Sequence, residues 1–407
     1  MNTPLETDRA PLRQWLAVAV LSLCTFIVVT SEMLPVGVLT PMAGGLGITP
    51  GMAGYSLTIT GVVAAIAAPI VPRVLGTLDR RTVLAVAMVL LAAGNALTVL
   101  AQDFAVLVVS RTVLGIGMGV VWSLAAVVAP RLVTPRHAAL AVSLAVSGVA
   151  AASVIGVPLG TLIGDAFGWR SAFGALTASA LLLAAILLIS LPKLPKPTAS
   201  ATSSTGGRPL LRTPAVVVGL IVVVFLVTAH FAAYTYIRPV LESSTGISAA
   251  SIAAILLAYG VFGLIGNFAA GALAAKRSRA TVVLLAFGIL VAITILALFS
   301  AVAAIAIAAI VVWGLAYGGL SVAGQIWMTR AATGNEENVT GLYVGVFTAS
   351  IALGAFLGGT VFEIAGMTPL LWTAAALALA ALATGLLGPG PSTITSEPRI
   401  PEKVPAA

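Results

Sequence analysis

Charged side chains are scarce in this chain. Asp, Glu, Lys and Arg make up 8% of its 407 residues, hydrophobic residues make up 60%, and the mean hydropathy is +1.15. A soluble domain usually carries about 25% charged residues, so this composition excludes an ordinary soluble protein. Val83–Leu100 and Val216–Val227 contain no charge at all, and apolar runs of about 20 residues are typical of transmembrane helices. We therefore expect an all-α integral membrane protein.

Cysteine is nearly absent too. Cys24 is the only one, and it lies inside the first apolar run, so a disulfide within the chain is impossible and a metal-thiolate site is not expected. The run Gly115-Ile-Gly117-Met-Gly119 has no strand before it and is not a dinucleotide loop. No phosphate loop, zinc spacing or Ser/His/Asp arrangement is convincing. We expect no metal, no cofactor and no enzymatic activity.

The net charge of +8 comes from basic residues gathered between the apolar segments. The clusters are Arg73/Arg80/Arg81, Arg131/Arg136, Lys193/Lys196/Arg208/Arg212 and Lys276/Arg277/Arg279. All of them fall on one side if both termini are cytoplasmic, and the opposite loops hold Asp103, Asp165, Glu242, Glu363 and one basic residue, Arg170. Basic loops mark the cytoplasmic side of a membrane protein. This pattern predicts a bacterial inner-membrane protein with both termini inside and no nucleic-acid partner. Met1 to Arg13 is polar and mixed in charge, and the apolar run after it is too long for a cleavable signal peptide, so none is expected.

Twelve apolar segments follow one another along the chain. They cover about 14–42, 51–73, 82–101, 103–130, 138–163, 170–191, 214–242, 249–273, 280–299, 302–329, 339–362 and 367–388. A stretch rich in Pro, Ser, Thr and Gly separates the sixth segment from the seventh. We therefore predict a six-helix bundle in 1–191, a flexible cytoplasmic linker in 192–213, a second six-helix bundle in 214–388 and a disordered cytoplasmic tail in 389–407.

The two halves repeat one another. Gly156, Gly160 and Gly168 recur 198 residues later as Gly354, Gly358 and Gly366, and Gly115 and Gly119 recur 199 residues later as Gly314 and Gly318. Six spans return the chain to its starting side, so the halves are parallel copies with a central pathway between them. Glycines at four-residue spacing let helices pack closely, and Pro158 is expected to kink the fifth span.

Three local patterns resemble the major facilitator superfamily, over essentially the whole chain. They are Arg111-Thr-Val-Leu-Gly115-Ile-Gly117 in span four, Gly156-Val-Pro158-Leu-Gly160 in span five and Thr30-Ser-Glu32 in span one. The likeness is to the twelve-helix drug:proton antiporters, including chloramphenicol-type exporters and the sugar, arabinose and purine-nucleoside branches. It implies two pseudo-symmetric bundles, a monomer and export driven by the proton gradient.

The loop between spans two and three is also similar to that family, with one departure. It reads Gly76-Thr-Leu-Asp79-Arg80-Arg81, with a shifted glycine and no second one. Because the charges of Asp79, Arg80 and Arg81 remain, we expect a cytoplasmic latch between spans.

Three residues inside the spans can carry protons or charge. Glu32 lies roughly 15 Å deep in span one and Arg111 roughly 12 Å deep in span four, while His230 lies near the middle of span seven, opposite Ser31 in the repeat. An ionisable group in hydrocarbon is a functional candidate by default. The plainer interpretations are a structural ion pair for Glu32, a tie to backbone carbonyls for Arg111 and hydrogen-bonded packing for His230. We predict that Arg111 neutralises ionised Glu32, and that His230 relays a proton or contacts substrate.

Other polar side chains are candidates for the substrate cavity. They are Tyr234, Tyr236, Arg238, Asn267, Trp313, Tyr317 and Gln325. For Arg238, an i,i+4 pair with Glu242 is the plainer interpretation, and Trp and Tyr at span ends are often interfacial anchors.

The sequence thus predicts a proton-coupled exporter of a small, drug-like organic molecule that works by alternating access. A dedicated sugar or nucleoside exporter is the alternative within transport. A non-transporting membrane sensor and an intramembrane enzyme are alternatives of other classes; the enzyme would need a nucleophile or metal cluster in the spans, and none is found.

Overall fold

The computed structural model describes residues 12–74, 78–194, 210–243 and 247–391. Over these ranges the chain forms helices and no strand. The α-helices are α1 (Leu12–Leu46), α2 (Pro50–Val74), α3 (Arg80–Leu100), α4 (Phe104–Val128), α5 (Ala138–Ala151), α6 (Val157–Phe167), α7 (Trp169–Ser190), α8 (Pro214–Tyr234), α9 (Ile237–Glu242), α10 (Ala249–Phe299), α11 (Ala303–Gly318), α12 (Leu320–Ala331), α13 (Glu336–Ala365) and α14 (Met367–Leu387). A π-helical turn, Ala152–Gly156, joins α5 to α6.

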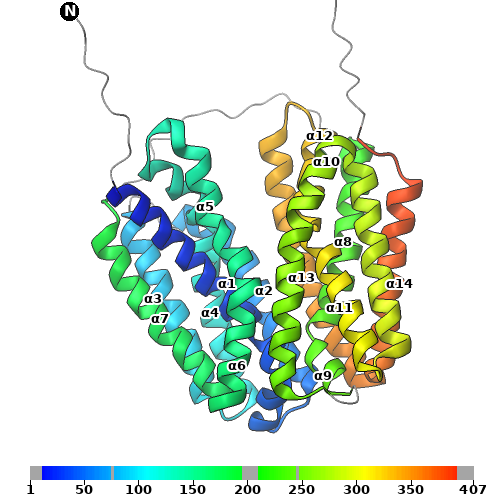
Figure 1. The fold of residues 1–407 in the computed structure, drawn as a ribbon. Coiled ribbons are helices and arrows are strands. Elements are labelled where there is room, and N and C mark those ends of the chain that lie inside the picture. The colour runs from blue at the N-terminus through cyan, green and yellow to red at the C-terminus, as the bar shows by residue number, and fades with distance from the viewer. Residues whose placement is uncertain (1–11, 75–77, 195–209, 244–246, 392–407) are drawn as a thin grey trace, which may run out of the picture.

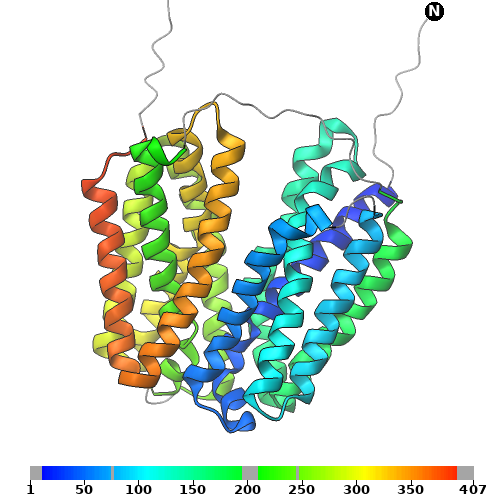
Figure 2. The same cartoon turned by 180° about the vertical axis from the view of Figure 1, so that it is seen from behind.

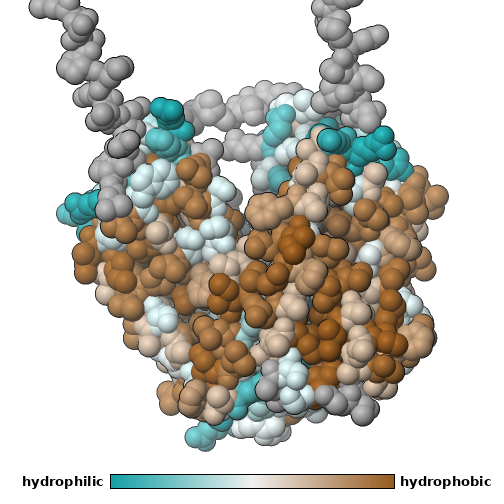
Figure 3. All heavy atoms as spheres, viewed as in Figure 1, coloured by the Kyte–Doolittle hydropathy of each residue, from teal (hydrophilic) through white to brown (hydrophobic). Residues whose placement is uncertain are grey.

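The helices stand in two groups, α1–α7 and α8–α14 (Figures 1 and 2). We call the end where α1 begins and α14 ends the terminal face, and the opposite end, where α1, α6 and α9 meet, the closed face (Figure 1). A belt of hydrophobic side chains surrounds the visible flank, and hydrophilic residues gather at the two ends (Figure 3). Such a belt is what a bilayer requires of a multi-pass membrane protein.

Within the part of the chain that the structure describes, eleven helices are long and apolar enough to cross a membrane. The longest of these candidate spans, Ser251–Phe299, has 49 residues, about twice what one crossing needs. α10 breaks at Arg277, where φ is −140° and ψ is 72°. Two crossings therefore meet at this residue inside one continuous element, where a longer loop between 273 and 280 was predicted. Counting both gives twelve crossings, so the predicted fold class is confirmed.

Four crossings are interrupted. α1 bends at Val38, between Pro35 and Pro41, and the fifth crossing passes through the π-helical turn just before Pro158. The seventh crossing breaks between α8 and α9, and the tenth breaks at Gly319. Proline removes a backbone donor, and kinks gather at Pro, at Gly and at π-bulges, so these breaks follow from local sequence.

The glycines of the repeat make equivalent contacts in the two halves. A Cβ at Gly156 would meet Thr30 of α1, and one at Gly354 would meet the carbonyl oxygen of Thr228 of α8 at 2.7 Å. Gly160 similarly faces Leu34, and Gly358 faces Ala232. In each half, then, the fifth crossing packs on the first through positions where only glycine fits.

A second pair of crossings repeats in the same way. Gly115 and Gly119 of α4 lie against the carbonyl oxygens of Thr60 and Ala64, and Gly314 and Gly318 of α11 lie against those of Tyr259 and Gly263. The second and fourth crossings of each half therefore make backbone contact, as the offset of 199 residues implies.

The repeat also relates the contacts between the halves. A Cβ at Gly61 of α2 would lie 3.2 Å from the Cβ of Ala352 of α13, and one at Gly260 of α10 would lie 2.6 Å from the carbonyl oxygen of Ser153. Both residues of one contact are 199 positions from those of the other. The halves thus meet across a pseudo-two-fold axis.

Of the predicted linker, 195–209 lies outside the described residues, as does 392–407 of the predicted tail. The predicted limits of the bundles, linker and tail remain a prediction.

Candidate functional site

Arg238 of α9 is the centre of a polar cluster at the closed face. Its Nη2 lies 2.8 Å from Oδ1 of Asp165 on α6, and its Nη1 donates to the carbonyl oxygen of Gly37 on α1. Its Nε lies 2.8 Å from Oε1 of Glu242, which is the expected i,i+4 pair. The Arg238 side chain is only 4% exposed. One guanidinium therefore ties the second group of helices to two elements of the first.

Further hydrogen bonds join the groups at this face. Thr40 of α1 donates to the other carboxylate oxygen of Glu242 at 2.6 Å. The buried hydroxyl of Tyr236 donates to the carbonyl oxygen of Gly51 at 3.3 Å, across the groups. Tyr55 and Thr360 are joined by their hydroxyls at 3.2 Å. At the terminal face, by contrast, the groups are separated by a hollow (Figure 3). The structure is thus closed at one face and open at the other.

Arg111 is fully buried beside α1. Its Nη1 donates to the carbonyl oxygen of Ser31 at 3.2 Å, and its guanidinium lies 4.9 Å from the ring centroid of Phe173. The side chain of Asn95 donates to the Ser31 hydroxyl at 3.0 Å. Nε and Nη2 of Arg111 have no partner, so the group keeps two free donors.

Glu32 follows Ser31 directly and is 5% exposed. Among the described residues it forms no ion pair, so the predicted pair with Arg111 is not made in this conformation. The guanidinium binds the neighbouring peptide carbonyl instead. Glu32 on α1 and Arg111 on α4 are thus neighbours through the peptide of Ser31.

His230 of α8 is the centre of an aromatic cluster. Its ring stacks on Tyr317 with a centroid separation of 3.3 Å and an angle of 6°, and it lies 5.0 Å from Tyr234. Trp313 stands edge-on at 5.3 Å and 78°. Tyr259 of α10 completes the cluster at 6.3 Å and 19°. We call these five residues the aromatic cluster.

Three buried polar atoms of this cluster have no hydrogen-bond partner. They are Nδ1 of His230, the hydroxyl of Tyr259 and Nε1 of Trp313. An unpaired buried polar atom typically costs about 1–3 kcal/mol, so such atoms need an explanation when they gather in one place. Tyr317 is the one half-buried ring of the five.

The other predicted cavity residues lie elsewhere. Tyr236 and Arg238 belong to the closed face. Asn267 donates to the carbonyl oxygen of Gly318 at 3.0 Å and ties α10 to the end of α11. Gln325 donates to Thr340 at 2.6 Å and ties α12 to α13. Both amides thus use their donors within the second group of helices.

The loop before α3 is fastened to the end of α7 at the terminal face. Asp79 accepts from the backbone N–H of Arg81 at 3.2 Å and from that of Leu194 at 2.7 Å. Arg80 donates its own N–H to Leu194, and Arg81 reaches the carbonyl oxygen of Leu188. This is a latch within the first group of helices.

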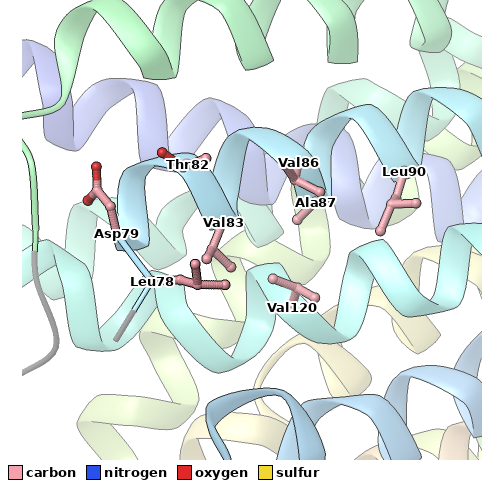
Figure 4. A pocket seen from close by; sticks show the side chains of 8 residues that line it. All are labelled: Leu78, Asp79, Thr82, Val83, Val86, Ala87, Leu90 and Val120. Atoms are coloured by element: carbon pink, nitrogen blue, oxygen red, sulfur yellow. The ribbon is translucent and has the colours of Figure 1, made fainter. Parts of the chain in front are cut away.

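A groove of about 390 Å³ lies beside that latch, along α3 and α4 (Figure 4). Aliphatic side chains such as Val83, Leu90 and Val120 line it, with Asp79 and Thr82 at one end. It shares no lining residue with the aromatic cluster or with Arg111.

Sequence reasoning missed four of these residues. Asn95 and Tyr259 are polar groups within apolar spans, and that position alone was a signal. The sequence predicts Asp165 in an outer loop, but no sequence feature identifies Arg238 of the other half as its partner. Phe173 looked like any other apolar residue of its span.

Comparisons with known proteins agree with this architecture. The family model described as Major Facilitator Superfamily matches residues 21–243 and 220–406. The chain is 32% identical over 372 residues to the transcription regulatory protein OpdE of Pseudomonas aeruginosa, covering 90% of this chain and 92% of that protein. It is 31% identical over 369 residues to the purine ribonucleoside efflux pump NepI of Escherichia coli O6:H1, covering 90% and 93%.

Solved structures share the fold. A crystal structure of a bacterial homolog to the human lysosomal transporter Spinster, in an inward-facing and unoccupied conformation, superimposes with a TM-score of 0.72. The match covers 93% of this chain and 95% of that one at 14% identity. At this identity the likeness concerns the fold alone.

Proposed function

Because the chain belongs to the Major Facilitator Superfamily, we propose that it exports a small organic molecule across a bacterial inner membrane in exchange for protons. The proposal rests above all on one observation: Glu32 is buried without an ion pair, next to an Arg111 that keeps two free donors. Such an arrangement can exist in two states, with and without a proton on the acid.

The terminal face is the cytoplasmic side in this proposal. Basic residues lie there between the crossings, among them Arg131, Lys193 and Lys276, while Asp103, Asp165, Glu242 and Glu363 lie at the closed face. The positive-inside rule supports this orientation. The structure then represents an inward-open state, sealed toward the outside by Arg238 and its partners.

Alternating access follows from breaking one set of contacts and making another. The ties of Arg238 and Thr40 at the closed face would separate, and the hollow at the terminal face would close. Two halves related by a pseudo-two-fold axis can rock about a fixed central site. The kinks and the glycine contacts let the helices pack closely and slide against one another during this motion.

Proton exchange is assigned to Glu32. An ionised carboxylate buried without a partner is costly, so the proposal assigns the protonated form of Glu32 to this inward-open state. Loss of that proton to the cytoplasm would let the carboxylate take Nε and Nη2 of Arg111 while substrate binds. Opening toward the outside would then protonate Glu32 and favour release. His230 is the second candidate for this proton path, because it is buried and its Nδ1 has no hydrogen-bond partner among the described residues.

Proteoliposomes with an internal pH dye provide the test. The wild type, Glu32→Gln and the control Glu363→Gln, an exposed acid at the closed face, are challenged with antibiotics, dyes, sugars and nucleosides. We expect one compound class to drive proton movement in the wild type and in the control, and not in Glu32→Gln, which still binds the compound. Equal proton movement in all three proteins would remove Glu32 as the coupling site.

A nucleoside substrate is the second candidate, and one relative favours it. NepI is named a purine ribonucleoside efflux pump and is similar over 90% of this chain. OpdE, named a transcription regulatory protein, instead favours a sensor. Binding of a compound with no transport of any tested compound would support the sensor.

A further inference from the structure

The aromatic cluster consists of nearly parallel rings with one perpendicular wall. The rings of Tyr317, Tyr234 and Tyr259 lie within 20° of the His230 plane. Trp313 stands at 84° to Tyr234 and at 86° to Tyr259. A planar ring parallel to His230 fits the stacking preference of such a set, because aromatic rings favour stacked and edge-on neighbours.

The polar atoms of the cluster are unusual for a packed core. His230, Tyr259 and Trp313 each bury a polar atom with no partner. Trp313 can only donate, the tyrosine hydroxyl can donate or accept, and a neutral histidine nitrogen does one or the other. Because Nδ1 bonds in the plane of the His230 ring, a ligand stacked on that ring can satisfy only the other two atoms. It would need an acceptor for Trp313, and a donor or an acceptor for Tyr259, on the edge of its ring.

Tyr317 occupies the face of His230 that such a ligand would use. It is the last residue but one of α11, directly before the break at Gly318 and Gly319. It is half-buried, whereas the other four rings are buried. Tyr317 is therefore the ring that can leave the stack with the least repacking.

We propose that a planar nitrogen heterocycle of purine size binds on the face of His230 in place of the Tyr317 ring, with its edge hydrogen-bonded to Tyr259 and Trp313. The proposal rests on the transport function above and specifies the part of the substrate that is recognised. A sugar alone cannot stack there, and a purely carbon ring would leave the polar atoms unpaired.

Equilibrium binding to the purified full-length protein tests the proposal without any gradient. The probes are adenine and hypoxanthine, which present different edge patterns, adenosine, free ribose, and a C-phenyl riboside whose ring has no nitrogen. We expect both bases to bind, ribose not to compete, and the phenyl riboside to bind at least about tenfold more weakly than adenosine.

Substitutions in the aromatic cluster test where the heterocycle binds. Tyr259→Phe and Trp313→Phe should each weaken base binding about tenfold, and His230→Ala by about tenfold to a hundredfold, because stacking is lost. Tyr317→Ala should bind at least as tightly as the wild type, since it removes the competing ring. The controls are Tyr343→Phe, whose hydroxyl already bonds to Ser321, and the exposed Trp372→Phe; thermal unfolding checks that every variant is folded.

The outcomes separate this proposal from the transport function. Loss of base binding in Tyr317→Ala, competition by ribose equal to that of adenosine, or no binding of either base would overturn it. Base binding with the expected variant pattern but without proton movement would uphold it and reject antiport. Proton movement driven by a non-aromatic compound, with neither base bound, would do the reverse.

Discussion

Arg238 of α9 and Asp165 of α6 form a buried ion pair of 2.8 Å that joins the two halves of the molecule at the closed face. The halves contribute opposite charges, and both side chains are largely shielded from water, at 4% and 15% exposure. Removing one partner of such a pair leaves the other charge buried and unpaired. The pair therefore favours the conformation in which the closed face is sealed.

Arg238→Ala should open the closed face. Loss of a buried ion-pair partner costs about 3 kcal/mol, which corresponds to a population shift of about 150-fold. Spin labels on cysteines at Phe167 and Ile364, both exposed at helix ends of different halves, would report a longer distance by pulsed electron resonance. Cys24→Ser gives a cysteine-free background, because Cys24 is the only cysteine.

Arg170→Ala is the matched control for that experiment. Arg170 also lies at the closed face, and its guanidinium donates to the carbonyl oxygens of Val99 and Ala101 within its own half. Its loss should leave the label distance unchanged. If both variants lengthen the distance equally, the effect comes from charge at this face and not from the tie between the halves.

Two glycine substitutions should have different consequences. A Cβ at Gly260 would lie 2.6 Å from the carbonyl oxygen of Ser153, in the other half, and one at Gly318 would collide with Gly263 in its own half. Gly260→Ala should therefore shift the protein away from this conformation with little change in unfolding temperature. Gly318→Ala should lower the unfolding temperature, since overpacking costs about 1–3 kcal/mol.

The same spin labels and a thermal-shift assay distinguish the two glycines. Gly260→Ala should move the label distance and Gly318→Ala should not. An equal loss of thermal stability in both variants would contradict the assignment of Gly260 to a contact that forms and breaks during transport.

The repeat explains why these glycine contacts were predictable. Gly156 and Gly354 are 198 positions apart, Gly115 and Gly314 are 199 positions apart, and the two glycines of each pair make equivalent contacts in the fold. Glycines at a fixed spacing indicate which helices pack closely together, and each of these contacts joins two helices of the same half. The twelve crossings could also be predicted, because the length of each apolar segment is enough to identify a crossing.

The partners of individual polar side chains could not be predicted in this way. Depth in the membrane placed Glu32 and Arg111 near each other, yet the guanidinium binds the carbonyl oxygen of Ser31. Arg238 was assigned its helical neighbour Glu242, and Asp165 was missed as its second partner. Such pairings depend on the rotation of each helix about its axis and on which face of the protein is open. Hydropathy and the spacing of the glycines give information on neither.

Asp79 should matter more than an ordinary helix cap. Asp79 and Asp103 cap the N-termini of α3 and α4, but only Asp79 also accepts from the N–H of Leu194. Asp103→Ala should cost about 1 kcal/mol as a lost cap. Asp79→Ala should cost more and should also speed tryptic cleavage after Lys193, one residue before Leu194. Identical cleavage rates in the two variants would show that the latch does not hold this segment.

Arg111→Lys tests whether charge alone serves the site. Lysine keeps the positive charge, but it lacks the planar fork that stacks on Phe173 and holds two free donors for Glu32. We expect substrate-driven proton movement in proteoliposomes to fall at least about tenfold, while the substrate still binds. Phe173→Leu should have a smaller effect, since a cation–π contact contributes about 0.5–2 kcal/mol. Full proton movement in Arg111→Lys would mean that Glu32 needs only a nearby charge, and the two free guanidinium donors would then have no part in coupling.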